Sequence, residues 1–264
     1  MLRGMQNDLR GFTVGATDGD IGTVEELYFD DTSFTVRHLV VDTGGWLGGR
    51  KVLISPVALR DVDLVGKRIN AALTKAQVEK SPDIDTDRPV SRQHEIEFYN
   101  YYGYPYYWGG PYLWGGDPYP YPLADRATDL EKERHWDWAG EGGDSHLRSS
   151  AEVSGYHIAA TDGDIGHVQD FLVDDATWAI RYLVVDTSNW WFGKKVLMSP
   201  EWIERVDWRD SKVQVSVTRE QIKQSPEYDP SAFVNRDYET RLHDHYRRPS
   251  YWSDRRDGRV MRSG

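Results

Sequence analysis

The chain of 264 residues contains no cysteine, which excludes disulfides, thiolate metal sites and cysteine nucleophiles. It also has no run of 18 or more apolar residues, so no transmembrane helix is expected. The first eight residues, MLRGMQND, lack the apolar stretch of a signal peptide. We therefore predict a cytoplasmic protein, for which peripheral attachment is the remaining route to a membrane.

Positive charge is in deficit along the chain. The formal net charge is −11 at pH 7. Proteins that bind duplex DNA or ribosomal RNA usually carry a clustered basic face that neutralises phosphates, so nucleic acid is not the expected partner. The length suits two domains of ordinary size, each with its own core.

The sequence also lacks the usual motifs of catalysis and of metal or cofactor binding. No Gly-x-Ser-x-Gly or His-Glu-x-x-His occurs, and the glycine-rich stretch 44–49 is not followed by Gly-Lys-Ser/Thr. Asp18 and Asp20 lack the further oxygen ligands of a calcium loop. His243 and His245 are two residues apart on a predicted helix and would point to different sides. We predict no catalytic residue, no metal, no cofactor and no enzymatic activity.

What the chain does contain is an internal repeat. The hexapeptide TDGDIG begins at Thr17 and again at Thr161, 144 positions later. Residues 16–82 align on 160–226 without a gap, and 29 of these 67 positions are identical. The chain is therefore built from two copies of one module.

Each copy has the pattern of a small β-barrel. About six short strands follow one another, with turns every 8 to 12 residues, as in closed all-β folds. Residues 36–41 are apolar on both faces, which predicts a strand covered on both sides. His38 in this strand corresponds to Tyr182, which favours a structural role over that of a base. Capping boxes at residues 74–77 and 218–221 predict a short helix after each set of strands.

These residues resemble those of the PRC-barrel domain. The resemblance lies in Gly-x-x-Ala-Thr-Asp-Gly-Asp-Ile-Gly-x-Val, then Asp-Asp, then Arg-x-Leu-Val-Val-Asp-Thr, then Lys-Val-Leu-(Ile/Met)-Ser-Pro, and it covers about 9–100 and 153–246. That domain occurs in the cytoplasmic part of the photosynthetic reaction-centre H subunit, in the C-terminal half of the ribosome maturation factor RimM and in stand-alone bacterial proteins. The resemblance implies a mainly β fold of two tandem small β-barrels. It implies a role in protein contacts without catalytic residues.

We predict four regions along the chain. Residues 1–100 form the first repeat with a trailing helix, and residues 151–246 form the second in the same way. Residues 101–150 form a linker rich in Tyr, Pro, Gly and Trp with a short charged helix, and residues 247–264 form a basic disordered tail. We expect the two repeats to pack face to face, with approximate two-fold symmetry, as an intramolecular pseudo-dimer.

The aromatic stretch is the most unusual part of the chain. Between residues 98 and 122, twelve of 25 residues are aromatic, five are Pro, five are Gly, and none is Lys or Arg. We considered three interpretations: a linker that lies against the barrels, an arm that binds a partner protein, and a platform that stacks carbohydrate or single-stranded nucleic acid. The candidate interaction surface consists of eight aromatic residues: Trp46, Tyr104, Tyr106, Tyr107, Trp108, Trp114, Trp190 and Trp191.

The functional prediction is a non-enzymatic interaction or scaffold protein of the stand-alone bacterial PRC-barrel type. One alternative is an accessory subunit of a photosynthetic reaction-centre or electron-transfer complex, and a further alternative is a ribosome-assembly factor. An enzyme or small-ligand binder would require a deep pocket with convergent polar groups.

Overall fold

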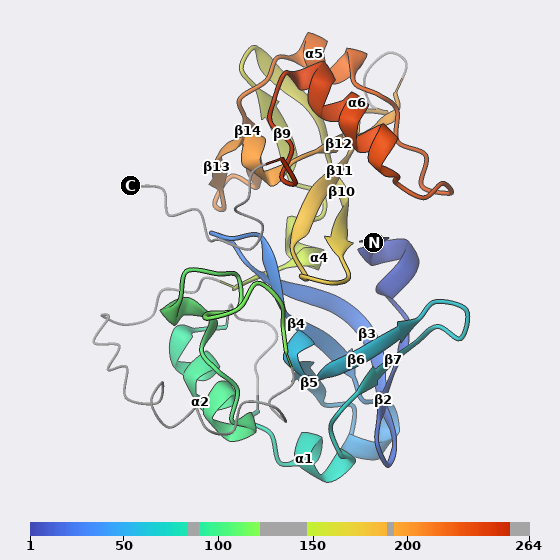
Figure 1. Cartoon of the computed structure of the whole chain (residues 1–264), viewed down its shortest axis with the longest axis vertical. Helices are drawn as coiled ribbons and strands as arrows, with labels where there is room; N and C mark the ends of the chain where they lie inside the picture. Colours follow the sequence, from blue (N-terminus) through green and yellow to red (C-terminus); the bar gives the residue numbers. More distant parts are fainter. Residues whose placement is uncertain (84–89, 122–146, 189–192, 254–264) are drawn as a thin grey trace. The chain divides into compact units, whose positions relative to one another are not determined.

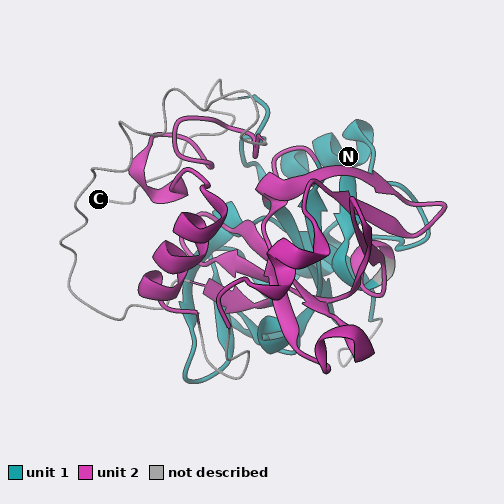
Figure 2. Cartoon of the chain, turned by 90° about the horizontal axis from the view of Figure 1, so that it is seen from below, with its two compact units in different colours: residues 1–7, 150–175, 180–257 teal, residues 8–149, 176–179, 258–264 magenta. Residues whose placement is uncertain are grey.

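The structure is a computed structural model that describes residues 1–83, 90–121, 147–188 and 193–253 (Figure 1). The chain divides into two compact units, drawn in different colours in Figure 2. Unit 1 comprises residues 1–7, 150–175 and 180–257, and unit 2 comprises residues 8–149, 176–179 and 258–264. Each unit holds one sequence repeat together with short segments from elsewhere in the chain. The expected face-to-face pseudo-dimer and the four predicted regions stay predictions.

Unit 2 contains one seven-stranded sheet with the first repeat. Its strands are β2 (Thr13–Ala16), β3 (Gly19–Asp30), β4 (Thr35–Asp42), β5 (Lys51–Ile54), β6 (Leu59–Asp63), β7 (Arg68–Ala71) and β8 (Leu147–Ser149). The order is β5-β4-β3-β2-β7-β6, and β8 pairs with β3. Neighbours are antiparallel except β2 and β7. The six strands predicted for the repeat are confirmed.

Unit 1 contains a second seven-stranded sheet of the same order. Its strands are β1 (Leu2–Gly4), β9 (His157–Ala160), β10 (Gly163–Asp174), β11 (Ile180–Asp186), β12 (Lys195–Met198), β13 (Ile203–Asp207) and β14 (Lys212–Val215). The order is β12-β11-β10-β9-β14-β13, and β1 pairs with β10. The mainly β fold with two barrel-like repeats is confirmed.

The sheets differ from the predicted closed barrels in one respect: they are not closed. In unit 2 the order begins at β5 and ends at β6, and no ladder between these strands is among the described pairings. A buried 3₁₀ turn, Pro56–Ala58, joins them. Pro56 has no amide hydrogen to donate, so the ladder of β5 ends there and the turn spans the gap. Residues 200–202 form the same turn in unit 1.

The helices are short, and all but α4 lie where the sequence predicts them. They are α1 (Lys75–Glu79), α2 (Arg92–Tyr102), α4 (Ser150–Val153), α5 (Arg219–Gln224) and α6 (Arg236–Tyr246). Single turns of other helix types are η1 (Met5–Leu9), η2 (Gly44–Leu47), η3 (Pro56–Ala58), η4 (Tyr107–Gly109) and η6 (Pro200–Trp202). Both predicted capping boxes form, at the starts of α1 and α5. No helix in the described part of the chain is long and apolar enough to cross a membrane.

The repeated hexapeptide is a structural turn that also begins a helix. Asp18 in the β2–β3 turn accepts a hydrogen bond at 2.8 Å from the amide of Lys75, the first residue of α1. In the second copy Asp162 accepts from the amide of Arg219 at 2.7 Å. A Cβ at Gly22 would lie 1.9 Å from the carbonyl oxygen of Asp42, so the strands approach too closely there for any other residue. These contacts account for the first aspartate and the last glycine of the hexapeptide.

Strand β4 is buried along both faces, as predicted. Its inner side chains include Leu39 and Val41, which have no exposed surface. Its outer side chain Val40 packs in a cluster with Phe98 and Tyr99 of α2. Helix α2 therefore covers the outer face of this sheet (Figure 1) and positions the groups described next.

Two other predicted features lie outside the described residues. They are the short charged helix of the linker and the part of the tail beyond residue 253.

Candidate functional site

Arg37 is the centre of a buried polar cluster in unit 2. Strand β4 carries it, and its side chain is only 1% exposed. Its guanidinium carbon lies 3.6 Å from the ring centroid of Tyr107, and Nη1 donates to the carbonyl oxygen of Leu113 at 2.6 Å. The Asp30 carboxylate is 4.0 Å from Nη2. Ring, carbonyl and carboxylate together compensate for part of the water that the guanidinium loses on burial.

Glu95 of α2 completes the cluster from above the sheet. It has no exposed surface, and its Oε1 accepts a hydrogen bond of 2.5 Å from the Tyr107 hydroxyl. Arg92 Nη1 lies 2.9 Å from its Oε2. Burial raises the pKa of Glu95 to about 7, although Arg92 and Tyr107 both favour the carboxylate. Glu95 therefore connects the helix to the aromatic segment through a carboxyl group that titrates near neutrality.

His38 lies beside Arg37 on the same strand, beneath α2. Its ring meets Phe98 edge-on, with the centroids 4.7 Å apart, and neither ring nitrogen has a hydrogen-bond partner among the described residues. Burial and, to a smaller extent, the charge of Arg37 together lower the pKa of His38 to about 3. The neutral imidazole thus fills the core beneath the helix, which agrees with the structural role expected for it.

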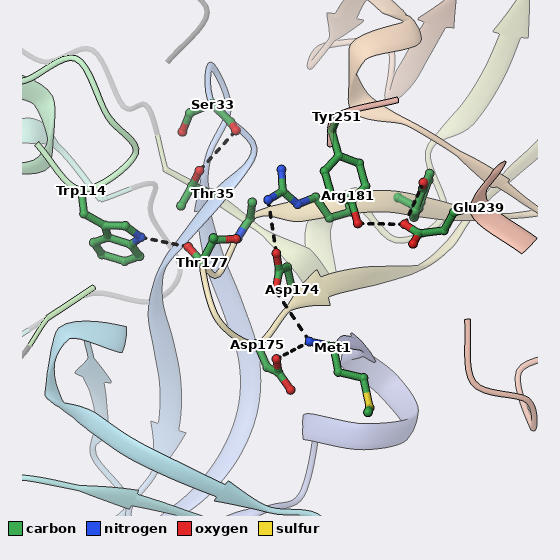
Figure 3. Close-up of polar contacts among 12 residues, drawn as sticks. Met1, Ser33, Thr35, Trp114, Asp174, Asp175, Thr177, Arg181, Glu239 and Tyr251 are labelled. Atoms are coloured by element: carbon green, nitrogen blue, oxygen red, sulfur yellow. Dashed lines mark hydrogen bonds and ion pairs between the residues drawn. The ribbon is translucent and has the colours of Figure 1, made fainter. Parts of the chain in front are cut away.

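Unit 1 repeats this cluster position by position. Arg181 lies 4.1 Å from the Tyr251 ring centroid, and the Tyr251 hydroxyl donates to Glu239 at 2.8 Å (Figure 3). Arg236 is 3.3 Å from the Glu239 carboxylate, and its guanidinium lies 4.0 Å from the Trp252 ring centroid. Each of these residues is 144 positions after its counterpart in unit 2. Our sequence reasoning missed Glu95 and Glu239, although the 144-residue offset would have found both.

The same contacts give defined positions to residues from the start of the predicted tail. Pro249 accepts a hydrogen bond at its carbonyl from His243 Nδ1, 2.9 Å away, and Tyr251 and Trp252 belong to the cluster. Aromatic and proline contacts therefore order residues 249–252 in unit 1. His243 Nε2 lies 2.9 Å from the Tyr182 hydroxyl, and His245 Nε2 lies 2.7 Å from the carbonyl of Gln221.

The two clusters differ in how they are covered. In unit 2 the Trp114 ring lies 4.9 Å from the Arg37 guanidinium, and its indole N–H donates to the carbonyl of Thr177 at 2.9 Å (Figure 3). The side chain of Arg181 is 14% exposed, whereas that of Arg37 is 1% exposed. Residues 257 and 258, which match Leu113 and Trp114, lie outside the described part.

The predicted surface residues divide into four groups. Tyr107 and Trp114 are buried in unit 2 and hold Arg37. Trp46 lies in the turn between β4 and β5, and its indole N–H donates to the carbonyl of Ile21 at 2.5 Å. It is not one of the residues of the buried cluster. Tyr104, Tyr106 and Trp108 are half-buried against the apolar cluster of α2. Trp190 and Trp191 lie outside the described residues.

The half-buried rings form stacked pairs on unit 2. Tyr106 stacks on Trp108 with centroids 4.6 Å apart, and Tyr102 stacks on Tyr104 at 5.2 Å. Three tyrosines of the same segment have larger exposed fractions: Tyr101 at 40%, Tyr119 at 42% and Tyr121 at 56%. This aromatic surface, defined as residues 101–121, keeps its outer rings exposed because the buried cluster holds its inner rings.

The arrangement is one of packing between buried charges and aromatic rings. In the described residues, no group of three or more His, Asp or Glu side chains has the geometry to hold a metal ion. The buried charges are paired with one another or with aromatic rings. These paired charges hold the aromatic surface against the sheet.

The described geometry agrees with the comparison with known proteins. A family model described as the PRC-barrel domain matches residues 6–78 and 148–222, which together make up more than half of the chain. A search of curated proteins gives no match.

Proposed function

Because the chain belongs to the PRC-barrel family, we propose that it is a non-enzymatic interaction or scaffold protein that recognises another protein through the aromatic surface of unit 2. PRC-barrel domains are generally non-catalytic and are typically interaction modules. The proposal includes a cytoplasmic location.

The observation that supports it best is the combination of buried anchoring and exposed rings. Arg37 and Glu95 hold the segment at Tyr107, while Tyr119 and Tyr121 remain exposed. Tyrosine and tryptophan are enriched at protein interfaces because their rings bury a large apolar area while their polar tips can hydrogen-bond. A protein partner also suits a surface segment without Lys or Arg, which could not neutralise phosphates.

Quantitative affinity purification of the full chain from the native cell tests the proposal. The variant Tyr119→Ala/Tyr121→Ala removes exposed rings without touching the buried cluster. The matched control is Val65→Ala, which removes an apolar side chain that is 97% exposed in a turn of the same unit. We expect one partner to be retained by the wild type and the control, and its recovery to fall at least about tenfold with the double variant.

Equal recovery from all three proteins would contradict the use of this surface. The identity of the retained proteins also separates the alternatives. Membrane-bound photosynthetic or electron-transfer subunits would favour an accessory role in such a complex, and small-subunit ribosomal proteins would favour a role in ribosome assembly.

A further inference from the structure

Each sheet includes one short strand that belongs to the other half of the sequence. This strand directly precedes the repeat that forms the other sheet. Arm 1, residues Leu2–Gly4, precedes the first repeat but pairs with β10 in unit 1. Arm 2, residues Leu147–Ser149, precedes the second repeat but pairs with β3 in unit 2. Both pairings are antiparallel and three residues long.

The two pairings share one register. Arm 1 places Leu2, Arg3 and Gly4 opposite Asp174, Val173 and Leu172. Arm 2 places Leu147, Arg148 and Ser149 opposite Asp30, Phe29 and Tyr28. Both arms therefore read Leu-Arg-small, and their three partners occupy matching positions of the two repeats. The two arms are offset by 145 residues, and their partner residues are offset by 144. The arms therefore correspond to each other in structure although they lie outside the gapless alignment of the repeats.

The arginine of each arm makes the same ion pair. Arg3 Nε lies 3.0 Å from Asp175 Oδ2, and Arg148 Nε lies 2.9 Å from Asp31 Oδ2. Asp31 and Asp175 are the second residues of the two Asp-Asp pairs that the sequence repeats. These side chains are mostly covered, with exposed fractions between 11% and 26%.

A second carboxylate at another repeated position contacts the end of arm 2 in unit 2 and the turn that follows arm 1 in unit 1. Glu26 accepts a hydrogen bond from the hydroxyl of Ser149, and Asp170 accepts one at 3.0 Å from the amide of Gln6. Leu147 packs in the apolar cluster beneath α2, where it is 2% exposed. Backbone pairing supplies affinity in such strand addition, and side-chain pockets and charges supply selectivity.

We propose that this strand edge of each repeat is an acceptor site for an extended Leu-Arg-small segment, occupied here by an arm of the same chain. Asp31 and Asp175 select the arginine, and the ladder fixes the register. Glu26 holds the end of arm 2, and Asp170 holds the turn that follows arm 1. The added strand also covers an edge that would otherwise present unpaired backbone groups. This inference is independent of the function proposed for the aromatic surface.

Disulfide trapping in the full chain tests which arm fills the site. The protein has no native cysteine, so Leu2→Cys/Asp174→Cys introduces one defined pair. Directly opposed residues of an antiparallel pair are close enough for a disulfide. We expect oxidation at micromolar concentration to give a cross-linked monomer, while Leu2→Cys alone gives no internal cross-link. Covalent dimers from the double variant would assign the site to a second copy, and an absent cross-link would show the site empty; either result overturns the proposal.

Charge exchange tests the recognition itself. Added to the cysteine pair, Arg3→Glu should slow cross-linking about fivefold, and Arg3→Glu/Asp175→Arg should restore the rate because the ion pair is rebuilt with reversed polarity. The matched control is Arg148→Glu/Asp31→Arg, which changes the other site and should leave the rate unchanged. If Arg3→Glu has no effect, or if Asp175→Arg fails to restore the rate, the ion pair is not the selecting contact.

Discussion

Glu95 shows what a single buried carboxyl group does to the pH dependence of this fold. Burial raises the pKa of Glu95 from 4.5 to about 7, so the folded chain keeps a proton that the unfolded chain has released between these two values. The stabilising effect of the neutral carboxyl is therefore complete below about pH 4.5 and is lost as the pH rises through 7.

We predict that Glu95→Gln removes this dependence. Glutamine is neutral and can still accept the hydrogen bond from Tyr107. Between pH 4.5 and 7.5 the free energy of unfolding of the wild type should fall by about 2–3 kcal/mol relative to that of the variant. Urea unfolding at a series of pH values measures the difference. Glu97→Gln, an exposed position on the same helix, should follow the wild type.

His38 and Tyr99 exchange residue types between the repeats, since their counterparts are Tyr182 and His243. In unit 1 the Tyr182 hydroxyl donates to Glu239 at 3.1 Å and contacts His243, whereas the nitrogens of His38 have no partner among the described residues. Either pair fills the space between strand and helix, but only one of them adds hydrogen bonds to the packing.

We predict that His38→Tyr alone destabilises unit 2 by about 1–3 kcal/mol, because the larger ring enters a filled core. Adding Tyr99→His should recover at least half of the loss, since the pair then matches that of unit 1. Urea unfolding at pH 7.5 compares the single and double variants. A double variant no more stable than the single one would show that the two positions are not coupled.

Among the elements, the short helices depend on carboxylates supplied from the hairpin turn. Asp18 accepts from the first amide of α1, and Asp162 does the same for α5. Asp20 instead pairs with Arg68 at 2.7 Å on the surface, where its side chain is 62% exposed. The two aspartates of each hexapeptide thus have different roles.

We predict that Asp18→Ala lowers the free energy of unfolding by about 0.5–2 kcal/mol, as loss of a helix cap does. Asp20→Ala should change it by less than about 0.5 kcal/mol, because exposed ion pairs contribute little. Denaturant titration of the two variants, repeated with Asp162→Ala and Asp164→Ala, measures both effects. Equal losses at the two positions would contradict the assignment.

Elements set by local pattern could be predicted, and those set by distant contacts could not. Strand alternation, capping boxes and the duplicated hexapeptide gave the six strands and both helices that follow them. The arms were missed because three residues carry no periodicity and pair with strands more than 100 positions away. Barrel closure was overestimated, since the sequence shows the proline that ends β5 but does not show whether β5 pairs with β6. The cluster around Glu95 was missed because its burial depends on distant partners, and the 144-residue offset to Glu239 was the signal in the sequence that could have revealed it.

At the scale of the whole molecule, neither compact unit corresponds to one continuous half of the chain. Unit 1 takes residues 1–7 from before the first repeat, and unit 2 takes residues 147–149 and 176–179 from around the second. In unit 2, Thr35 bridges to Ala179, and the amide of Val36 donates to the carbonyl of Trp178 at 2.8 Å. Each half of the sequence therefore supplies backbone hydrogen bonds to the unit built mainly from the other.

We predict that cutting the backbone once does not separate the halves. A specific protease site inserted within residues 122–146 would divide the chain into two fragments, each holding an arm bound in the other repeat. The fragments should co-elute in gel filtration under native conditions and separate in denaturant. Arg3→Glu/Arg148→Glu should weaken their association, and free elution of the wild-type fragments would contradict the prediction.

Because the two arms are nearly identical, arm 1 of the nascent polypeptide could pair with either β3 or β10. Arm 1 leaves the ribosome before any acceptor edge exists, and the first edge to form afterwards belongs to β3, whose native occupant is made more than 100 residues later. Until β10 appears, arm 1 can occupy the β3 edge with the same three-residue register and a matching aspartate. Correct assembly then requires arm 1 to leave this edge before arm 2 can pair with β3.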